Sequence, residues 1–262
     1  MARLQIHTSL PDVSLDVIIP EFMHSGKARE QKLTEQEYYE NRNLPVLWLL
    51  HGGLGNATDW PRYTMIELYA EEKGIIVVCP TGNNGCWVNQ VSGSPWEDVL
   101  TEKLWEFVHR MFPTSDKPED NYIAGLSMGG YGALRIGLLH SERYSRIGAF
   151  SSGICIPQEY SVGEFRGPGG EQSFGDPAAV IGSDFDGYAV AERRAAAAKE
   201  SGEKLPPIYL SCGTEDFMYK ANIEYREHLK KLGYDVTWDE GPFRHEWRFW
   251  DQQVEKFIRT LP

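Results

Sequence analysis

The chain has 262 residues, of which 41% are hydrophobic and 12% aromatic, enough apolar material for a substantial core. Its formal net charge of −12 argues against nucleic acids and anionic membranes as partners. Segment 1–20 lacks the basic end and apolar block of a secretory signal, and no apolar run reaches the roughly 20 residues of a membrane span. We therefore expect a cytoplasmic protein with one globular domain over residues 1–262.

Short runs of β-branched and large apolar residues have the length of buried parallel strands. In chain order these runs are 15–20, 45–50, 74–80, 121–125, 146–150, 207–212 and 234–240. Segments with helical periodicity lie between them, at 62–73, 97–112, 127–140, 216–232 and 246–260. Because strands alternate with helices, the sequence predicts an α/β fold whose mostly parallel central sheet is flanked by helices.

Two segments interrupt this alternation. Residues 24–43 are strongly polar and predict a surface hairpin loop with room for a helical turn. Residues 153–205 are too long for a plain loop and include a helix-like run, 189–201. This insert is either a small lid over the substrate-binding edge of the sheet or a structural excursion with one solvated helix, and the residues favour neither.

The cysteines and histidines show no metal-binding pattern. Cys79, Cys86, Cys155 and Cys212 have no C-x-x-C spacing, which is typical of free thiols in a reducing compartment, and we expect them to be buried and inert. The seven histidines form no H-x-x-x-H pair. We expect neither a metal nor another cofactor.

The stretch IAGLSMGGYG, residues 123–132, contains the pattern G-x-S-x-G between an apolar run and a helix-like run. In a strand–turn–helix unit the two glycines allow a tight turn that exposes the serine hydroxyl. A serine hydroxyl is a weak nucleophile and needs a base to accept its proton. The pattern therefore predicts Ser127 as the nucleophile of an α/β-hydrolase fold.

In this fold an acid and then a histidine follow the nucleophile along the chain. Asp216 follows the strand-like run 207–212, and His245 lies between the last strand and the last helix. Both positions come after the carboxyl end of a strand, where sites assemble in α/β sheets. Ser127 would attack a carbonyl carbon, His245 would accept its proton and later return it, and Asp216 would orient the imidazole. Glu215 is the alternative acid, but the shorter carboxylate at the turn favours Asp216.

A tetrahedral oxyanion needs backbone N–H donors. The residue directly after the nucleophile, Met128, is predicted to supply one of them. The loop after the second strand-like run reads HGGLG at 51–55, and glycine there lets the backbone approach a ligand closely. We assign the second donor to Gly53, and we expect His51 to be a structural hydrogen-bonding residue under the loop.

Four blocks together resemble the esterase D-like, or putative esterase, family of α/β-hydrolases, and most closely its bacterial tributyrin esterases: LLHGGLGNATDW, GLSMGGYGALRIGLLHSERYSRIGAFSSG, CGTEDF and HEWRFWDQQVEKFI. The resemblance spans about residues 12–261. It implies a cofactor-free serine carboxylesterase for short acyl chains, acting on a small-molecule ester and forming a cytosolic homo-oligomer. It also implies the same site, with the triad Ser127, Asp216 and His245 and the oxyanion donors Gly53 and Met128.

Relatives in the family leave other substrates open. An acetylxylan or feruloyl esterase would act on acylated oligosaccharides of plant walls, and an S-formylglutathione hydrolase would cleave a thioester. Segment 83–100, NNGCWVNQVSGSPWEDVL, lacks the aromatic-Asn-Ala-Thr pattern of the formylglutathione hydrolases, which disfavours the thioester. A catalytically silent binding module on a hydrolase scaffold is the alternative from a different class.

Several side chains near these motifs are candidates for substrate contacts. Family analogy places Trp60 and Trp87 near the rim of the pocket, where an indole can cover an acyl chain or stack on a sugar ring. Trp247 and Trp250 are three apart on one helix face, so we expect them in the core. Arg244, beside the predicted catalytic histidine, either reaches a polar or anionic alcohol or remains solvated.

Overall fold

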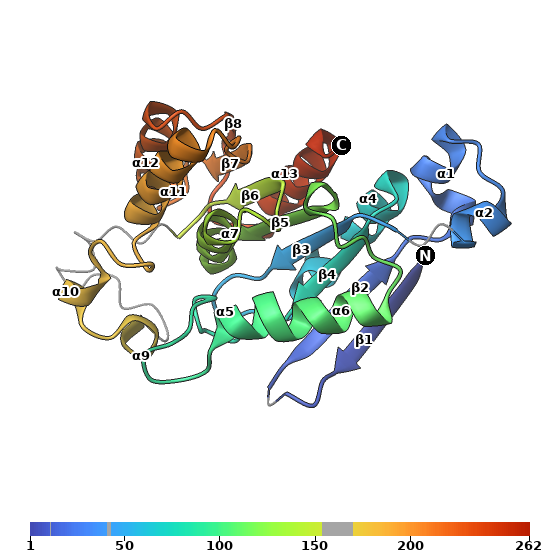
Figure 1. Cartoon of the computed structure of the whole chain (residues 1–262), viewed down its shortest axis with the longest axis horizontal. Helices are drawn as coiled ribbons and strands as arrows, with labels where there is room; N and C mark the ends of the chain where they lie inside the picture. Colours follow the sequence, from blue (N-terminus) through green and yellow to red (C-terminus); the bar gives the residue numbers. More distant parts are fainter. Residues whose placement is uncertain (11, 41–42, 154–169) are drawn as a thin grey trace.

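The computed structural model describes residues 1–10, 12–40, 43–153 and 170–262 (Figure 1). Within these residues eight strands form one sheet in the spatial order β1-β2-β4-β3-β5-β6-β7-β8. The strands are β1 (Ala2–His7), β2 (Ser14–Ile19), β3 (Val46–Leu50), β4 (Ile76–Pro80), β5 (Asn121–Leu126), β6 (Arg146–Phe150), β7 (Ile208–Gly213) and β8 (Val236–Gly241). Strand β2 is antiparallel to both of its neighbours, whereas β4, β3 and β5 to β8 are parallel. The predicted mostly parallel sheet is confirmed.

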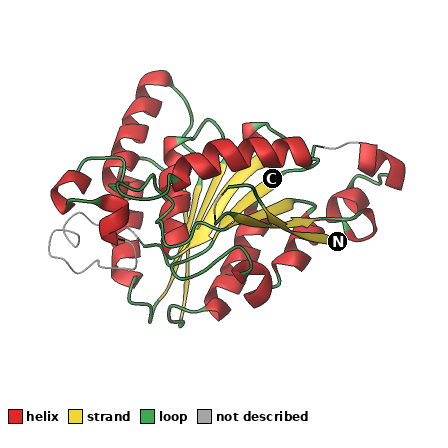
Figure 2. Ribbon diagram, turned by 90° about the horizontal axis from the view of Figure 1, so that it is seen from below, coloured by secondary structure: helices red, strands yellow, loops and turns green. Residues whose placement is uncertain are grey.

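Helices cover both faces of the sheet (Figure 2). One face carries α3 (Asp59–Tyr63), α4 (Ile66–Lys73) and α13 (Trp247–Thr260). The other face carries α5 (Trp96–Asp98), the π-helical turn η2 (Val99–Leu104), α6 (Trp105–Met111), α7 (Met128–Leu139), α11 (Gly187–Ser201) and α12 (Tyr219–Lys231). Shorter helices are η1 (Phe22–His24), α1 (Gly26–Glu30), α2 (Glu35–Glu40), η3 (Pro118–Asp120), α9 (Gly170–Phe174) and α10 (Pro177–Val180).

Strand β3 shows why the central strands are continuous apolar runs. Trp48 and Leu50 point into the core on the α7 side, whereas Leu47 and Leu49 point into the core under α4 and α13. Successive side chains of a strand face opposite sides, so a strand covered on both faces needs apolar residues at every position. The layers of the fold therefore follow directly from these runs.

The order of the strands places the candidate site. Strand β3 lies between β4, which follows it in the chain, and β5, which comes later. The chain therefore crosses from β3 to β4 on one side and then from β4 to β5 on the other side of β3, and such a reversal places a crevice at the carboxyl ends of β3 and β5. The loop that carries Gly53 and the turn that carries Ser127 both begin there.

The two predicted interruptions have different outcomes. The polar segment 24–43 contains α1 and α2, so it holds more helix than the single predicted turn. Within the insert, residues 154–169 lie outside the described residues, and the prediction of a lid falls partly on them. Helix α11 is not simply solvated, because Val190 and Ala191 are buried in the core shared with α7. No helix in the described parts of the chain is long and apolar enough to cross a bilayer.

Candidate active site

Ser127 lies at the junction between β5 and α7 with a backbone φ of 51° and ψ of −118°. A positive φ is uncommon and strained for a residue that carries a Cβ, and such strain concentrates at functional sites. Hydrogen bonds hold the turn, since the Ser127 N–H donates to the Phe150 carbonyl and the Ser127 carbonyl accepts from the Gly153 N–H, both at 2.9 Å. The turn is thus fixed against β6.

The glycines on either side of the serine are required by close backbone contacts. A Cβ on Gly125 would lie 2.3 Å from the Gly129 carbonyl oxygen. A Cβ on Gly129 would lie 2.4 Å from the Leu50 carbonyl oxygen and 2.5 Å from that of His51. Because no side chain fits in these gaps, α7 packs directly on the end of β3.

Asp216 and His245, predicted as acid and base, are hydrogen-bonded to each other. Asp216 Oδ2 and His245 Nδ1 are 2.9 Å apart, and the Met218 N–H also donates to the carboxylate, at 2.8 Å. Burial alone would raise the pKa of Asp216, but the hydrogen bonds from His245 and Met218 hold that pKa below its usual value. Glu215 points elsewhere and pairs with Arg244 at 3.5 Å. The structure thus brings Asp216, and not Glu215, to the imidazole.

The Ser127 hydroxyl and the His245 ring are not hydrogen-bonded to each other in the part of the chain that the structure describes. Catalytic contacts of this kind commonly tighten only when substrate binds. A chain of contacts joins the two residues. The Ser127 N–H donates to the carbonyl of Phe150, the last residue of β6, and the next residue, Ser151, accepts a hydrogen bond from the Trp250 indole at 3.1 Å. The Trp250 ring packs edge-on against His245, with 4.8 Å between ring centroids.

Ser151 is a supporting residue that sequence reasoning missed. It is fully buried with a φ of 46°, and its hydroxyl accepts from the Trp250 indole. The same hydroxyl helps to hold the pKa of Asp216 below its usual value. The sequence shows only a serine after a strand, since nothing in "SSG" signals a positive φ.

Two backbone N–H groups at this edge of the sheet, those of Gly53 and Met128, have no hydrogen-bond acceptor among the described residues. In contrast, the next N–H in the loop, that of Leu54, donates to Asn84 Oδ1 at 2.6 Å. A Cβ on Gly53 would meet nothing within 4 Å, so this part of the loop borders open space.

His51 holds the same loop from below, as predicted. Its Nε2 accepts from the Gly82 N–H at 2.9 Å, so the proton lies on Nδ1, which donates to the Gly52 carbonyl at 2.7 Å. Burial lowers the pKa of His51 to about 4. The imidazole is therefore neutral near pH 7 and acts as a structural link.

The predicted placement of Trp60 and Trp87 at a pocket rim is wrong, because both indoles are buried. Trp60 donates its N–H to the Leu50 carbonyl at 3.0 Å, and Trp87 donates to the His51 carbonyl at 3.2 Å. The two rings thus support the end of β3 and the start of the glycine loop from within. Arg244 lies at the surface beside His245.

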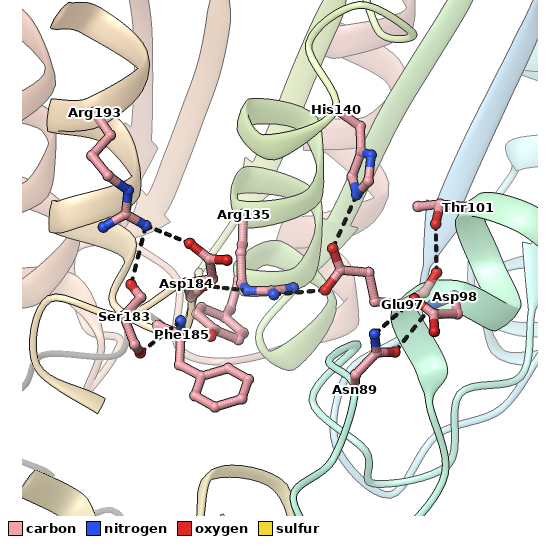
Figure 3. A network of polar contacts seen from close by, with 11 residues as sticks. Asn89, Glu97, Asp98, Thr101, Arg135, His140, Ser183, Asp184, Phe185 and Arg193 are labelled. Atoms are coloured by element: carbon pink, nitrogen blue, oxygen red, sulfur yellow. Dashed lines mark hydrogen bonds and ion pairs between the residues drawn. The ribbon is translucent and has the colours of Figure 1, made fainter. Parts of the chain in front are cut away.

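Helix α7, which follows Ser127, is tied to its neighbours by an ion pair between buried Arg135 and partly buried Glu97 (Figure 3). Arg135 of α7 donates to Glu97 of α5 at 2.6 Å and to the Asp184 carbonyl in the turn before α11. His140 contacts the other Glu97 oxygen at 3.0 Å. The Arg135 guanidinium also lies 5.7 Å from the centroid of the Phe185 ring. Three separate segments therefore converge on Glu97 and Arg135.

Comparisons with known proteins agree over most of the chain. The family model described as "Putative esterase" matches residues 29–258. An acetyl esterase from Caldicellulosiruptor saccharolyticus is 32% identical over 231 residues, which cover 84% of each chain. FphF, a fluorophosphonate-binding serine hydrolase of Staphylococcus aureus, superimposes with a TM-score of 0.83 at 26% identity, covering 99% of this chain and 98% of that one. The S-formylglutathione hydrolase FrmB of the same organism gives 0.82 at 27% identity, with the same coverage of 99% and 98%.

Proposed function

Since the chain belongs to the "Putative esterase" family of α/β-hydrolases and is a carboxylic ester hydrolase, we propose that it cleaves short-chain acyl esters through an acyl intermediate on Ser127. The observation that carries this proposal is the strained turn at Ser127 at the same sheet edge as the Asp216–His245 pair. A buried, ionised carboxylate bonded to Nδ1 leaves Nε2 as the proton acceptor.

In the proposed mechanism the Ser127 oxygen attacks the ester carbonyl carbon while His245 Nε2 takes the hydroxyl proton. The N–H groups of Gly53 and Met128 stabilise the oxyanion, and each such donor typically lowers the barrier by about 3–4 kcal/mol. The C–O bond to the alcohol then breaks, and His245 gives its proton to the leaving oxygen. Water repeats the sequence on the acyl-serine and releases the carboxylic acid.

The short acyl group rests on the similarity to an acetyl esterase. A thioester substrate is the second candidate, supported by the 27% identity to a formylglutathione hydrolase. A carbohydrate ester is less well supported, because Trp60 and Trp87 are buried in the core and cannot stack on a sugar ring.

A panel of substrates run on purified protein tests the proposal. It contains p-nitrophenyl acetate through octanoate, S-formylglutathione, methyl ferulate and acetylated xylo-oligosaccharide. We expect the acetate and butyrate to be fastest, and Ser127→Ala to lose activity by a factor of at least about 10⁴. Ser92→Ala, an exposed serine outside the site, is the matched control and should retain full activity. Turnover retained by Ser127→Ala would contradict the mechanism, and a higher rate on ferulate, xylan or thioester would change the assigned substrate.

A further inference from the structure

The turn after β7 exposes a large aromatic side chain directly beside the proposed catalytic base. Phe217 is 74% exposed, although it follows the buried Asp216. Its ring centroid lies 4.7 Å from that of His245, with an angle of 46° between the ring planes. An aromatic ring left in solvent at a site is typical of a surface that a ligand covers.

His245 lies between two aromatic rings, of which one is buried and the other is exposed. Trp250 packs edge-on against the imidazole at 4.8 Å and is buried, with its N–H bonded to Ser151. Phe217 packs on the same imidazole from the solvent side. The buried ring therefore supports the base, whereas the exposed ring is available to a bound molecule.

The chemistry of the proposed function indicates which part of the substrate lies there. His245 returns its proton to the leaving oxygen, so the alcohol oxygen must come within hydrogen-bonding distance of the imidazole when the C–O bond breaks. The carbon atoms attached to that oxygen then lie beside the imidazole, where Phe217 is the exposed apolar surface. The Arg244–Glu215 pair borders the same turn, at 80% and 55% exposure.

We propose that Phe217 is the apolar wall of the leaving-alcohol subsite and that it favours esters of aromatic alcohols over esters of small alkyl alcohols. This inference rests on the proposed function. It concerns the alcohol alone, because the acyl group stays on Ser127 after the alcohol has departed. The residue therefore affects acylation and not the hydrolysis of the acyl-enzyme.

The test compares benzyl acetate with ethyl acetate, which differ only in the alcohol. In Phe217→Ala the ratio of kcat/KM for the benzyl ester to that for the ethyl ester should fall about 3- to 10-fold, the range expected for one aromatic contact. Phe217→Tyr, which keeps the ring, should retain the ratio. The rate of hydrolysis of the preformed acetyl-enzyme should be unchanged in both variants. Met23→Ala, an equally exposed apolar side chain on η1, is the matched control.

Two results would overturn the subsite. The first is an unchanged ratio in Phe217→Ala. The second is an equal loss for both esters together with slower hydrolysis of the acetyl-enzyme, because that pattern means that Phe217 only holds His245 in place. Both results leave the serine mechanism standing. A wild-type protein that hydrolyses neither ester, or a Ser127→Ala variant that hydrolyses both, would instead contradict the proposed function itself.

Discussion

At the scale of single residues, Ser151 supports the Asp216–His245 pair of the proposed site. Its hydroxyl accepts from Trp250, which packs against His245, and it helps to lower the pKa of Asp216. Its φ of 46° is strained for a residue with a Cβ, whereas glycine adopts such a φ without strain. The hydroxyl and the backbone conformation can therefore be separated by substitution.

We expect Ser151→Gly and Ser151→Ala to lower kcat by the same factor, about tenfold, with KM little changed. Both variants lose the acceptor of the Trp250 indole, and a buried donor left unsatisfied costs about 1–3 kcal/mol. Ser151→Ala should melt earlier than Ser151→Gly, because alanine, like serine, is strained at the positive φ whereas glycine is not. If Ser151 were only structural, activity would follow stability and the glycine variant would be more active than the alanine variant. Steady-state kinetics and thermal melts of the two variants decide between these outcomes.

His51 predicts a pH dependence of folding stability. Its pKa is about 4 in the folded protein against an ordinary value of 6.5, so the unfolded chain takes up the proton first as the pH falls. The free energy of unfolding should therefore be unaffected above about pH 6.5 and should fall by about 3 kcal/mol as the pH drops toward 4. Urea unfolding of the wild type and His51→Gln at several pH values in this range measures the effect. The stability difference between the two proteins should shrink toward acid pH, and parallel curves would contradict the assignment.

At the scale of secondary-structure elements, the ion pair of Arg135 and Glu97 fixes α7 to α5 and to the turn before α11 (Figure 3). Arg135 is 3% exposed and Glu97 13%. Burial alone would raise the pKa of Glu97, but the hydrogen bond from His140 and the charge of Arg135 hold it below its usual value. Both partners therefore remain charged in a poorly solvated place, where losing one of them leaves the other uncompensated.

Arg135→Met should lower the free energy of unfolding by about 3 kcal/mol, because partly buried Glu97 loses the charge of Arg135 and keeps only the contact with His140. The double variant Arg135→Met with Glu97→Gln should recover much of that loss. Arg193→Met removes an exposed partner of Asp184 in the same turn and should cost less than about 1 kcal/mol. Urea unfolding of the four proteins measures these values. Equal losses of unfolding free energy in Arg135→Met and Arg193→Met would contradict a stabilising role specific to the Arg135–Glu97 pair.

At the scale of the whole molecule, the sheet was largely predictable from the sequence. Each of the seven predicted strands falls on one of β2 to β8, since most of these strands are continuous apolar runs buried on both faces. The missing strand, β1, lies at the sheet edge and carries mostly exposed side chains, so it shows no apolar run. Segments covered by the rest of the protein are thus readable from composition, whereas a solvated edge strand is not.

The site was predictable only where local sequence determines it. The glycines around Ser127 follow from the needs of a tight turn, and the chain order of Asp216 and His245 is that of the α/β-hydrolase fold. In contrast, the burial of Trp60 and the contacts of Ser151 depend on which elements pack together in space, and no short stretch of sequence contains that information.

In the proposed mechanism, Ser127 carries the acyl group during turnover. Rapid mixing with p-nitrophenyl acetate, an acid quench and mass spectrometry of the intact and digested protein test it most directly. We expect the wild type to gain the mass of one acetyl group on the peptide containing Ser127, and Ser127→Ala to gain none and to release no burst of p-nitrophenol. An acetyl group on another residue, or full turnover by Ser127→Ala without any adduct, would contradict it.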